Sequence, residues 1–170
     1  MHLTLRFLGD IEESVGHAIL NAAAEVAETI PPFRVSARGL GCFPGPHKPS
    51  VVWLGVHAEG DGLFRLQKAV ESAARTAGLE RERRSFKPHL TLGRIKPPAS
   101  TLSWTDLAAA HASFDVGAWM VRDVALFASE LHPAGARYTR LAAVSLGNTS
   151  LGNTGLGKTS LGNDSLGTAE

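Results

Sequence analysis

The stretch HLTLRFLGD (residues 2–10) opens with four residues that recur in FKPHLTLGRIK (residues 86–96). In both copies of HLTL, polar and apolar residues alternate, which is the side-chain period of a β-strand. Residues two apart on a strand point to the same face. We therefore expect strands at residues 2–8 and 89–95, each with its histidine and threonine on one face and its leucines buried on the other.

His2 and His89 make these two expected strands a candidate active site. Imidazole has a pKa near neutrality, so one histidine can take up a proton while the other donates one. Cleavage of a phosphodiester needs both transfers. The hydroxyls of Thr4 and Thr91 can donate hydrogen bonds to phosphate oxygens as negative charge develops on them. One His-x-Thr motif is commonplace on a strand surface, but two copies with identical apolar positions favour a paired acid–base site that needs no metal and no cofactor.

The rest of the chain alternates between helical and strand patterns. Apolar residues at helical spacing predict helices at residues 12–29 and 61–77. A short helix is expected at 104–110, with Ser103 as its N-cap. Short loops between the remaining strands favour antiparallel pairing, and hence an α+β fold. These strands are expected at residues 33–37, 51–56, 114–120, 121–127 and 137–144, with a Gly/Pro-rich loop at 39–49.

Charge is nearly balanced over the chain but uneven along it. Seventeen Lys and Arg against sixteen Asp and Glu give a net charge of +1, which excludes a protein that coats nucleic acid by charge alone. Basic residues gather between Arg81 and Lys96, and such a patch suits a phosphate-bearing ligand. A solvated loop is the alternative interpretation of this stretch.

The expected location of the protein is the cytoplasm. The single cysteine, Cys42, allows no internal disulfide, in agreement with a reducing compartment. No apolar run reaches the length of a membrane span, and the first residues lack the pattern of a signal peptide.

The last residues form a segment of a different kind. From Ser145 to the end, units such as SLGNT repeat every five residues. Each unit offers at most one leucine for burial and contains a glycine, which cannot offset the entropy of ordering the chain. We therefore expect one folded domain at residues 1–144 and a disordered low-complexity tail at 145–170.

Several of these stretches resemble the two-histidine phosphoesterases, and among them the RNA 2',3'-cyclic phosphodiesterases, also called 2'-5' RNA ligases. The resemblance rests on residues 2–10 and 86–96, on VVWLGV (51–56), and on VALFASEL (124–131) with Tyr138. It covers about residues 1–144. It implies a bilobal α+β fold with pseudo-two-fold antiparallel sheets, flanking helices and a central cleft. It also implies metal-independent hydrolysis of RNA 2',3'-cyclic phosphates to 2'-phosphates, with cleavage of the P–O3' bond.

The resemblance also implies a role for each site residue. His2 is the acid that protonates O3', His89 is the base that activates water, and the residues alone leave this order open. Thr4, Thr91 and Arg94 bind the phosphate. Strict strand alternation would turn Arg94 away from His89, so we expect a bulge at Gly93 or the end of the strand there.

The sequence also suggests roles for two further aromatic residues. Trp53 is assigned to the core. Tyr138 matches a family position, and both buried hydrogen bonding and catalysis remain open for it.

The sequence departs from the family pattern at its start. Family members usually carry a strand and a helix before the first motif, which here begins at residue 2; we expect that this N-terminal strand and helix are missing. An unpaired segment at a chain end tends to fray. We expect a monomer that binds RNA ends or cyclic nucleotides, with self-association through an exposed sheet edge as an alternative.

Three other functions remain open from the sequence. The first is a non-catalytic module that binds nucleotides or RNA ends, and the second is a phosphodiesterase of small cyclic nucleotides. The third is 2'-5' RNA ligation, the reverse reaction, which the same residues would serve.

Overall fold

The computed structural model describes residues 2–95, 103–133 and 135–147 of the chain. Helices and strands are mixed along the sequence, and every strand pair is antiparallel. The expected α+β class is therefore confirmed. The elements are α1 (Glu13–Glu28), β1 (Phe33–Phe43), β2 (Val51–Ala58), α2 (Gly62–Thr76), β3 (His89–Arg94), α3 (Trp104–Ala110), β4 (Asp115–Val121), β5 (Asp123–His132) and β6 (Gly135–Ser145).

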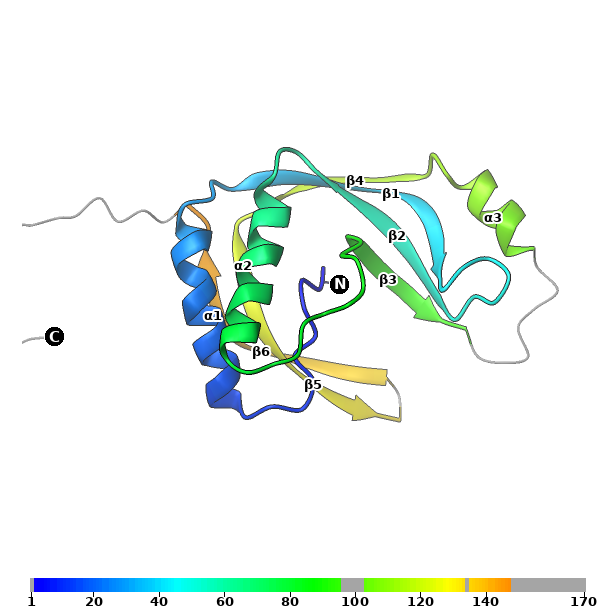
Figure 1. Ribbon diagram of the computed structural model, residues 1–170. Helices are drawn as coiled ribbons and strands as arrows, with labels where there is room; N and C mark the ends of the chain where they lie inside the picture. Colours follow the sequence, from blue (N-terminus) through cyan, green and yellow to red (C-terminus); the bar gives the residue numbers. More distant parts are fainter. Residues whose placement is uncertain (1, 96–102, 134, 148–170) are drawn as a thin grey trace, which may run out of the picture.

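The strands form two sheets of unequal size. The larger sheet has the order β3-β2-β1-β4, and β5 and β6 form a separate two-stranded sheet. Figure 1 shows the larger sheet curling over one side of the molecule, with β5 and β6 below it. The second motif therefore lies on an edge strand, because among the described strands only β2 pairs with β3.

The core lies where the two long helices meet the sheets. α1 contacts α2, β5 and β6, because each helix has an apolar stripe at helical spacing. Leu63 and Leu66 of α2 are 2% and 1% exposed, and they cluster with Val35 of β1 and Leu90 of β3. Full burial of one such side chain contributes about 1.5–3 kcal/mol.

β1 is longer than its sequence pattern predicts. The expected loop at 39–49 begins only after Phe43, because Gly39 adopts a φ of 75° and the register with β2 shifts between Arg38 and Leu40. A positive φ is available to glycine without strain, so the bulge lets the strand continue. The added length carries Phe43 to the neighbourhood of β3.

The strand expected at residues 2–8 does not form. Within the described part of the chain, residues 2–10 pair with no strand. A cavity of about 1050 Å³ is lined by these residues and by side chains of α1, α2, β5 and β6. A strand requires a partner backbone for its N–H and C=O groups, and β5 and β6 pair with each other instead. The alternation of polar and apolar residues is therefore not sufficient to predict a strand here, because it does not show which backbone the segment would pair with.

The packed part of the chain extends slightly beyond the expected boundary at residue 144. β6 extends to Ser145, and Leu146 is 5% exposed in the main core cluster. The backbone N–H of Leu146 donates to the carbonyl of Arg122 at 2.8 Å. The expected disorder of the tail falls largely on residues 148–170, which lie outside the described residues.

Candidate active site

The second motif has the geometry expected from its sequence. In the ladder between β2 and β3, His89 lies opposite Gly55 and Thr91 lies opposite Trp53, while Leu90 lies opposite Leu54. Cross-strand partners share a face of the sheet, so His89 and Thr91 share one face. Leu90 is 8% exposed on the other face. The predicted arrangement of histidine, threonine and the first leucine is confirmed here.

A bulge in β3 changes the facing of the residues that follow. The register passes from Trp53–Thr91 to Val52–Gly93, which leaves Leu92 as the extra residue. Leu92 is 47% exposed, so the expected burial of this leucine is wrong. Arg94 lies opposite Val51, and Val51 shares its face of β2 with Trp53.

The bulge therefore places Arg94 on the same face as Thr91 and His89. The interruption expected near Gly93 is confirmed. It solves the problem that strict alternation raised, because the extra residue reverses the facing of every position after it.

The imidazole of His89 is fixed by one hydrogen bond and two rings. Its Nδ1 lies 2.6 Å from the carbonyl oxygen of Lys87. A carbonyl oxygen only accepts hydrogen bonds, so Nδ1 carries the proton and Nε2 has the free lone pair. The rings of Phe43 and Trp53 lie edge-on to the imidazole, with centroids 5.0 and 6.1 Å away. Nε2 is therefore the nitrogen able to accept a proton.

Trp53 lies beside the candidate site because of a glycine on the neighbouring strand. Gly41 is its cross-strand partner, and a Cβ at this position would overlap the indole ring. The indole therefore covers Gly41 and reaches both Phe43 and His89. The assignment of Trp53 to the core is corrected: it is half-buried, and its ring faces the candidate catalytic histidine.

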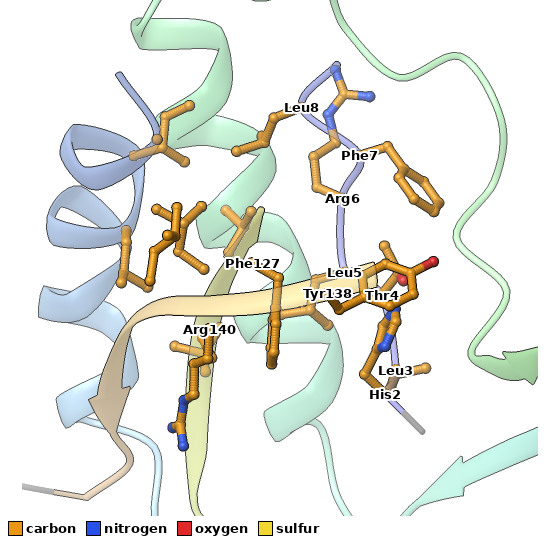
Figure 2. A pocket seen from close by; sticks show the side chains of 18 of the residues that line it. His2, Leu3, Thr4, Leu5, Arg6, Phe7, Leu8, Phe127, Tyr138 and Arg140 are labelled. Atoms are coloured by element: carbon orange, nitrogen blue, oxygen red, sulfur yellow. The ribbon is translucent and has the colours of Figure 1, made fainter. Parts of the chain in front are cut away.

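The first motif is held by side chains rather than by a sheet. His2 is stacked on Phe127 of β5, with centroids 5.8 Å apart, and meets Tyr138 of β6 edge-on at 4.5 Å. Figure 2 shows the imidazole beside the Tyr138 ring, with Thr4 farther along the same segment. Both His2 and Thr4 line the cavity described above.

The surroundings of His2 change its acid–base properties. Partial burial of the imidazole lowers the pKa of His2 from its ordinary value of 6.5, because the charged form loses hydration. Tyr138 is 48% exposed, so its part in this site is a ring contact with His2 rather than buried hydrogen bonding.

Leucines from both motifs pack in one place. Leu3 and Leu5 are half-buried against the core cluster that contains Leu90. The leucines of both motifs therefore contribute to the same core cluster. That the two imidazoles face each other across a cleft stays a prediction.

The basic stretch before the second motif is partly neutralised. Arg84 donates to both oxygens of Glu82, at 3.0 and 2.9 Å, while Arg81, Arg83 and Lys87 are exposed. Arg84 thus belongs to a surface ion pair, in line with the solvated-loop interpretation. The other cations remain available to an anionic ligand.

Two aromatic neighbours of the histidines had no signal in the sequence. Phe43 and Phe127 approach His89 and His2 only through strand pairing, and pairing partners cannot be read from local periodicity.

Over residues 2–95, 103–133 and 135–147, no three His, Cys, Asp or Glu side chains gather as a metal site would require. No helix in the described part of the chain is long and apolar enough to cross a membrane.

Comparison with known protein families identifies relatives of this chain. The sequence model of the 2'-5' RNA ligase superfamily matches residues 1–133. The RNA 2',3'-cyclic phosphodiesterase of Methanothermobacter thermautotrophicus is 36% identical over 146 residues, which is 86% of this chain and 78% of that protein. The protein of the same name from Archaeoglobus fulgidus is 38% identical over 141 residues, covering 83% of this chain and 77% of the relative.

Solved structures share the fold. A crystal structure of a Thermus thermophilus protein superimposes with a TM-score of 0.69 at 32% identity, covering 86% of this chain and 78% of that one. Escherichia coli LigT complexed with 3'-AMP superimposes with a TM-score of 0.62 at 27% identity, covering 85% and 76% of the two chains.

Proposed function

Because the chain belongs to the 2'-5' RNA ligase superfamily, we propose that it hydrolyses 2',3'-cyclic phosphates at RNA ends to 2'-phosphates. The observation that carries this proposal is the duplicated HLTL motif in a chain 36% and 38% identical to two RNA 2',3'-cyclic phosphodiesterases. Both copies of the motif retain the histidine and the threonine that the chemistry requires.

In the proposed reaction, the two histidines move one proton each. Nε2 of His89 takes a proton from water, whose oxygen forms a new bond to phosphorus. The P–O3' bond breaks, and His2 donates its proton to the leaving O3' oxygen. The product carries a 2'-phosphate and a free 3'-hydroxyl. The hydrogen bond from His89 Nδ1 to Lys87 supports the role of His89 as base, because in the neutral imidazole it makes Nε2 the nitrogen that can accept a proton.

The lowered pKa of His2 bears on its role as acid. At neutral pH the free protein holds His2 mainly as the neutral imidazole. A bound cyclic phosphate is an anion, and an anion beside an imidazole raises its pKa. Substrate binding would therefore load the acid with its proton.

Three donors are proposed to hold the phosphate. Thr91 and Arg94 share a face of β3 with His89, and Thr4 lies two residues from His2. Hydroxyl and guanidinium donors stabilise the charge that develops on the non-bridging oxygens. We propose that this set works on RNA ends in the cytoplasm, as a monomer whose catalytic domain occupies about residues 1–144.

A binding module without catalysis is the second candidate. It is favoured by one observation: residues 2–10, which carry His2 and Thr4, have no strand partner among the described residues. A mobile acid would leave binding intact and turnover low.

One experiment separates these candidates. The full chain is incubated with a short oligoribonucleotide that ends in a 2',3'-cyclic phosphate, and separately with 2',3'-cyclic AMP. Products are compared by chromatography with 2'- and 3'-phosphate standards. The proposal predicts 2'-phosphate alone, with the oligonucleotide preferred. Release of 3'-phosphate would contradict the bond assignment, and binding without turnover would establish the non-catalytic module.

A further inference from the structure

Arg6 connects the segment of the first motif to two other parts of the fold. Its Nε lies 3.0 Å from Glu71 Oε2 on α2, an ion pair without hydrogen-bond geometry. Nη1 donates to Glu82 Oε2 at 3.2 Å, and Nη2 donates to the carbonyl of Glu80. All three nitrogens of the guanidinium therefore contact groups of α2 or of the loop between α2 and β3. The side chain is only 10% exposed.

The partners of Arg6 are also bonded to each other. The second oxygen of Glu71 accepts the backbone N–H of Glu82 at 3.1 Å. The Arg84 guanidinium, with a smaller contribution from Arg6, lowers the pKa of Glu82 to about 2. Glu82 is therefore ionised at every pH near neutrality.

The position of this network in the chain relates it to both histidines. Arg6 lies four residues after His2, in the segment that has no strand partner in the described structure. The loop that contains Glu80 and Glu82 leads to Lys87, whose carbonyl fixes His89. Figure 2 shows Arg6 and His2 at opposite ends of one stretch, with the guanidinium directed away from the rings that hold His2.

We propose that Arg6 is a positioning residue that holds the His2 segment in register with the loop that leads to His89. The proposal rests on the proposed function, because it assumes that the two imidazoles work as a pair. Most strands keep their register through backbone pairing. Here a largely buried guanidinium and the two leucines of the motif replace that pairing.

We expect the connection through Arg6 to affect the catalytic rate more than it affects substrate binding. Acid–base catalysis requires both imidazoles within hydrogen-bond reach of the reacting atoms, and a misplacement of about 1 Å can cost roughly 10²-fold in rate. Removal of the guanidinium also leaves Glu71 and Glu82 as neighbouring carboxylates that repel each other. Arg6→Met should therefore free the first segment and lower kcat, with a smaller effect on KM.

Arg84 provides a matched control. It pairs with the same Glu82, but from the exposed side, and its side chain is 81% exposed. Arg84→Met removes a Glu82 ion pair without cutting the connection to the first motif. Glu82→Gln is the milder test, because it keeps the Arg6–Glu71 pair and retains an oxygen that can accept from Arg6.

The experiment measures the histidines directly. The titration of the His2 and His89 ring protons is followed by NMR in wild type, Arg6→Met, Glu82→Gln and Arg84→Met, alongside kcat and KM on 2',3'-cyclic AMP and the thermal melt. We expect the pKa of His2 to rise toward 6.5 in Arg6→Met, because the imidazole leaves its half-buried site. Its kcat should fall at least about tenfold. Glu82→Gln should also raise the pKa of His2 and lower kcat, but by less than Arg6→Met does. Arg84→Met should match wild type in both quantities.

The experiment distinguishes a failure of the positioning role of Arg6 from a failure of the proposed function. A His2 titration in folded Arg6→Met that matches wild type would overturn the positioning role, and so would an equal shift in Arg84→Met. If Arg6→Met does not fold, Glu82→Gln decides by the same titration. Wild-type protein that fails to hydrolyse the substrate contradicts the proposed function, while the NMR comparison still tests the connection.

Discussion

Nδ1 of His89 lies 2.6 Å from the carbonyl oxygen of Lys87, two residues earlier in the chain. This contact sets the tautomer of the imidazole before any substrate arrives. It leaves Nε2 as the reactive nitrogen, and it ties the orientation of the ring to the backbone at the start of β3.

The tautomer of His89 is directly measurable. Nitrogen NMR should show that the neutral imidazole of His89 carries its proton on Nδ1, because the carbonyl accepts only from a protonated nitrogen. His89→Asn keeps a side-chain N–H near this position and should preserve the fold while abolishing the base. A proton on Nε2, or an equal mixture of tautomers, would contradict the assignment.

The pH dependence of the reaction reports on His2. As the proposed acid, His2 must be protonated, and burial lowers the pKa of its imidazole below 6.5 in the free protein. The pH profile of kcat/KM, which reports the free protein, should therefore contain one ionisation below pH 6.5, and His2→Ala should remove it. In the substrate complex the phosphate anion raises the pKa of His2, so the corresponding ionisation in the profile of kcat should lie at higher pH. A kcat/KM profile without an ionisation below pH 6.5 would contradict the part that His2 is assigned.

The proposed reaction should not depend on a metal ion. Two imidazoles, two hydroxyls and one guanidinium can move both protons and bind the phosphate charge. Hydrolysis of 2',3'-cyclic AMP should therefore survive prolonged treatment with EDTA. Loss of activity after chelation, followed by recovery with zinc or manganese but not with buffer alone, would require a different mechanism.

Leu146 should mark the end of the packed domain. It is 5% exposed and belongs to the main core cluster, so Leu146→Ala should cost about 2–5 kcal/mol of unfolding free energy. Removal of residues 148–170 should leave the melting temperature close to that of the full chain, because the repeats offer little apolar surface. Thermal melts of both variants check this. A large drop on removal of 148–170 would show that the later leucines also pack.

Much of the fold could be predicted from local patterns. Helical spacing located α1 and α2 within one or two residues, since their apolar faces are the ones buried. The identical positions in the two motifs indicated which residues share a face, and glycine after Leu92 indicated an interruption of β3 that the ladder confirms. These features depend only on neighbours a few residues away.

The remaining features depend on partners distant in the sequence. Residues 2–8 alternate as a strand does, but no described strand pairs with them. Phe43 reaches His89 only because Gly39 lets β1 continue across a bulge. The rings that hold His2 come from β5 and β6, near the other end of the folded domain in sequence. Periodicity contains no information on such contacts.

The central claim is that His2 and His89 work as one acid–base pair. The most direct test is the rate of hydrolysis of an oligoribonucleotide 2',3'-cyclic phosphate by wild type, His2→Ala and His89→Ala. His17→Ala serves as control, because His17 lies on α1 and pairs there with the exposed Glu13, away from the candidate site. The account predicts a loss of ~10²–10⁴-fold in each of the two site variants, folded proteins in both, and a wild-type rate in the control. A near wild-type rate in either His2→Ala or His89→Ala would contradict the pair.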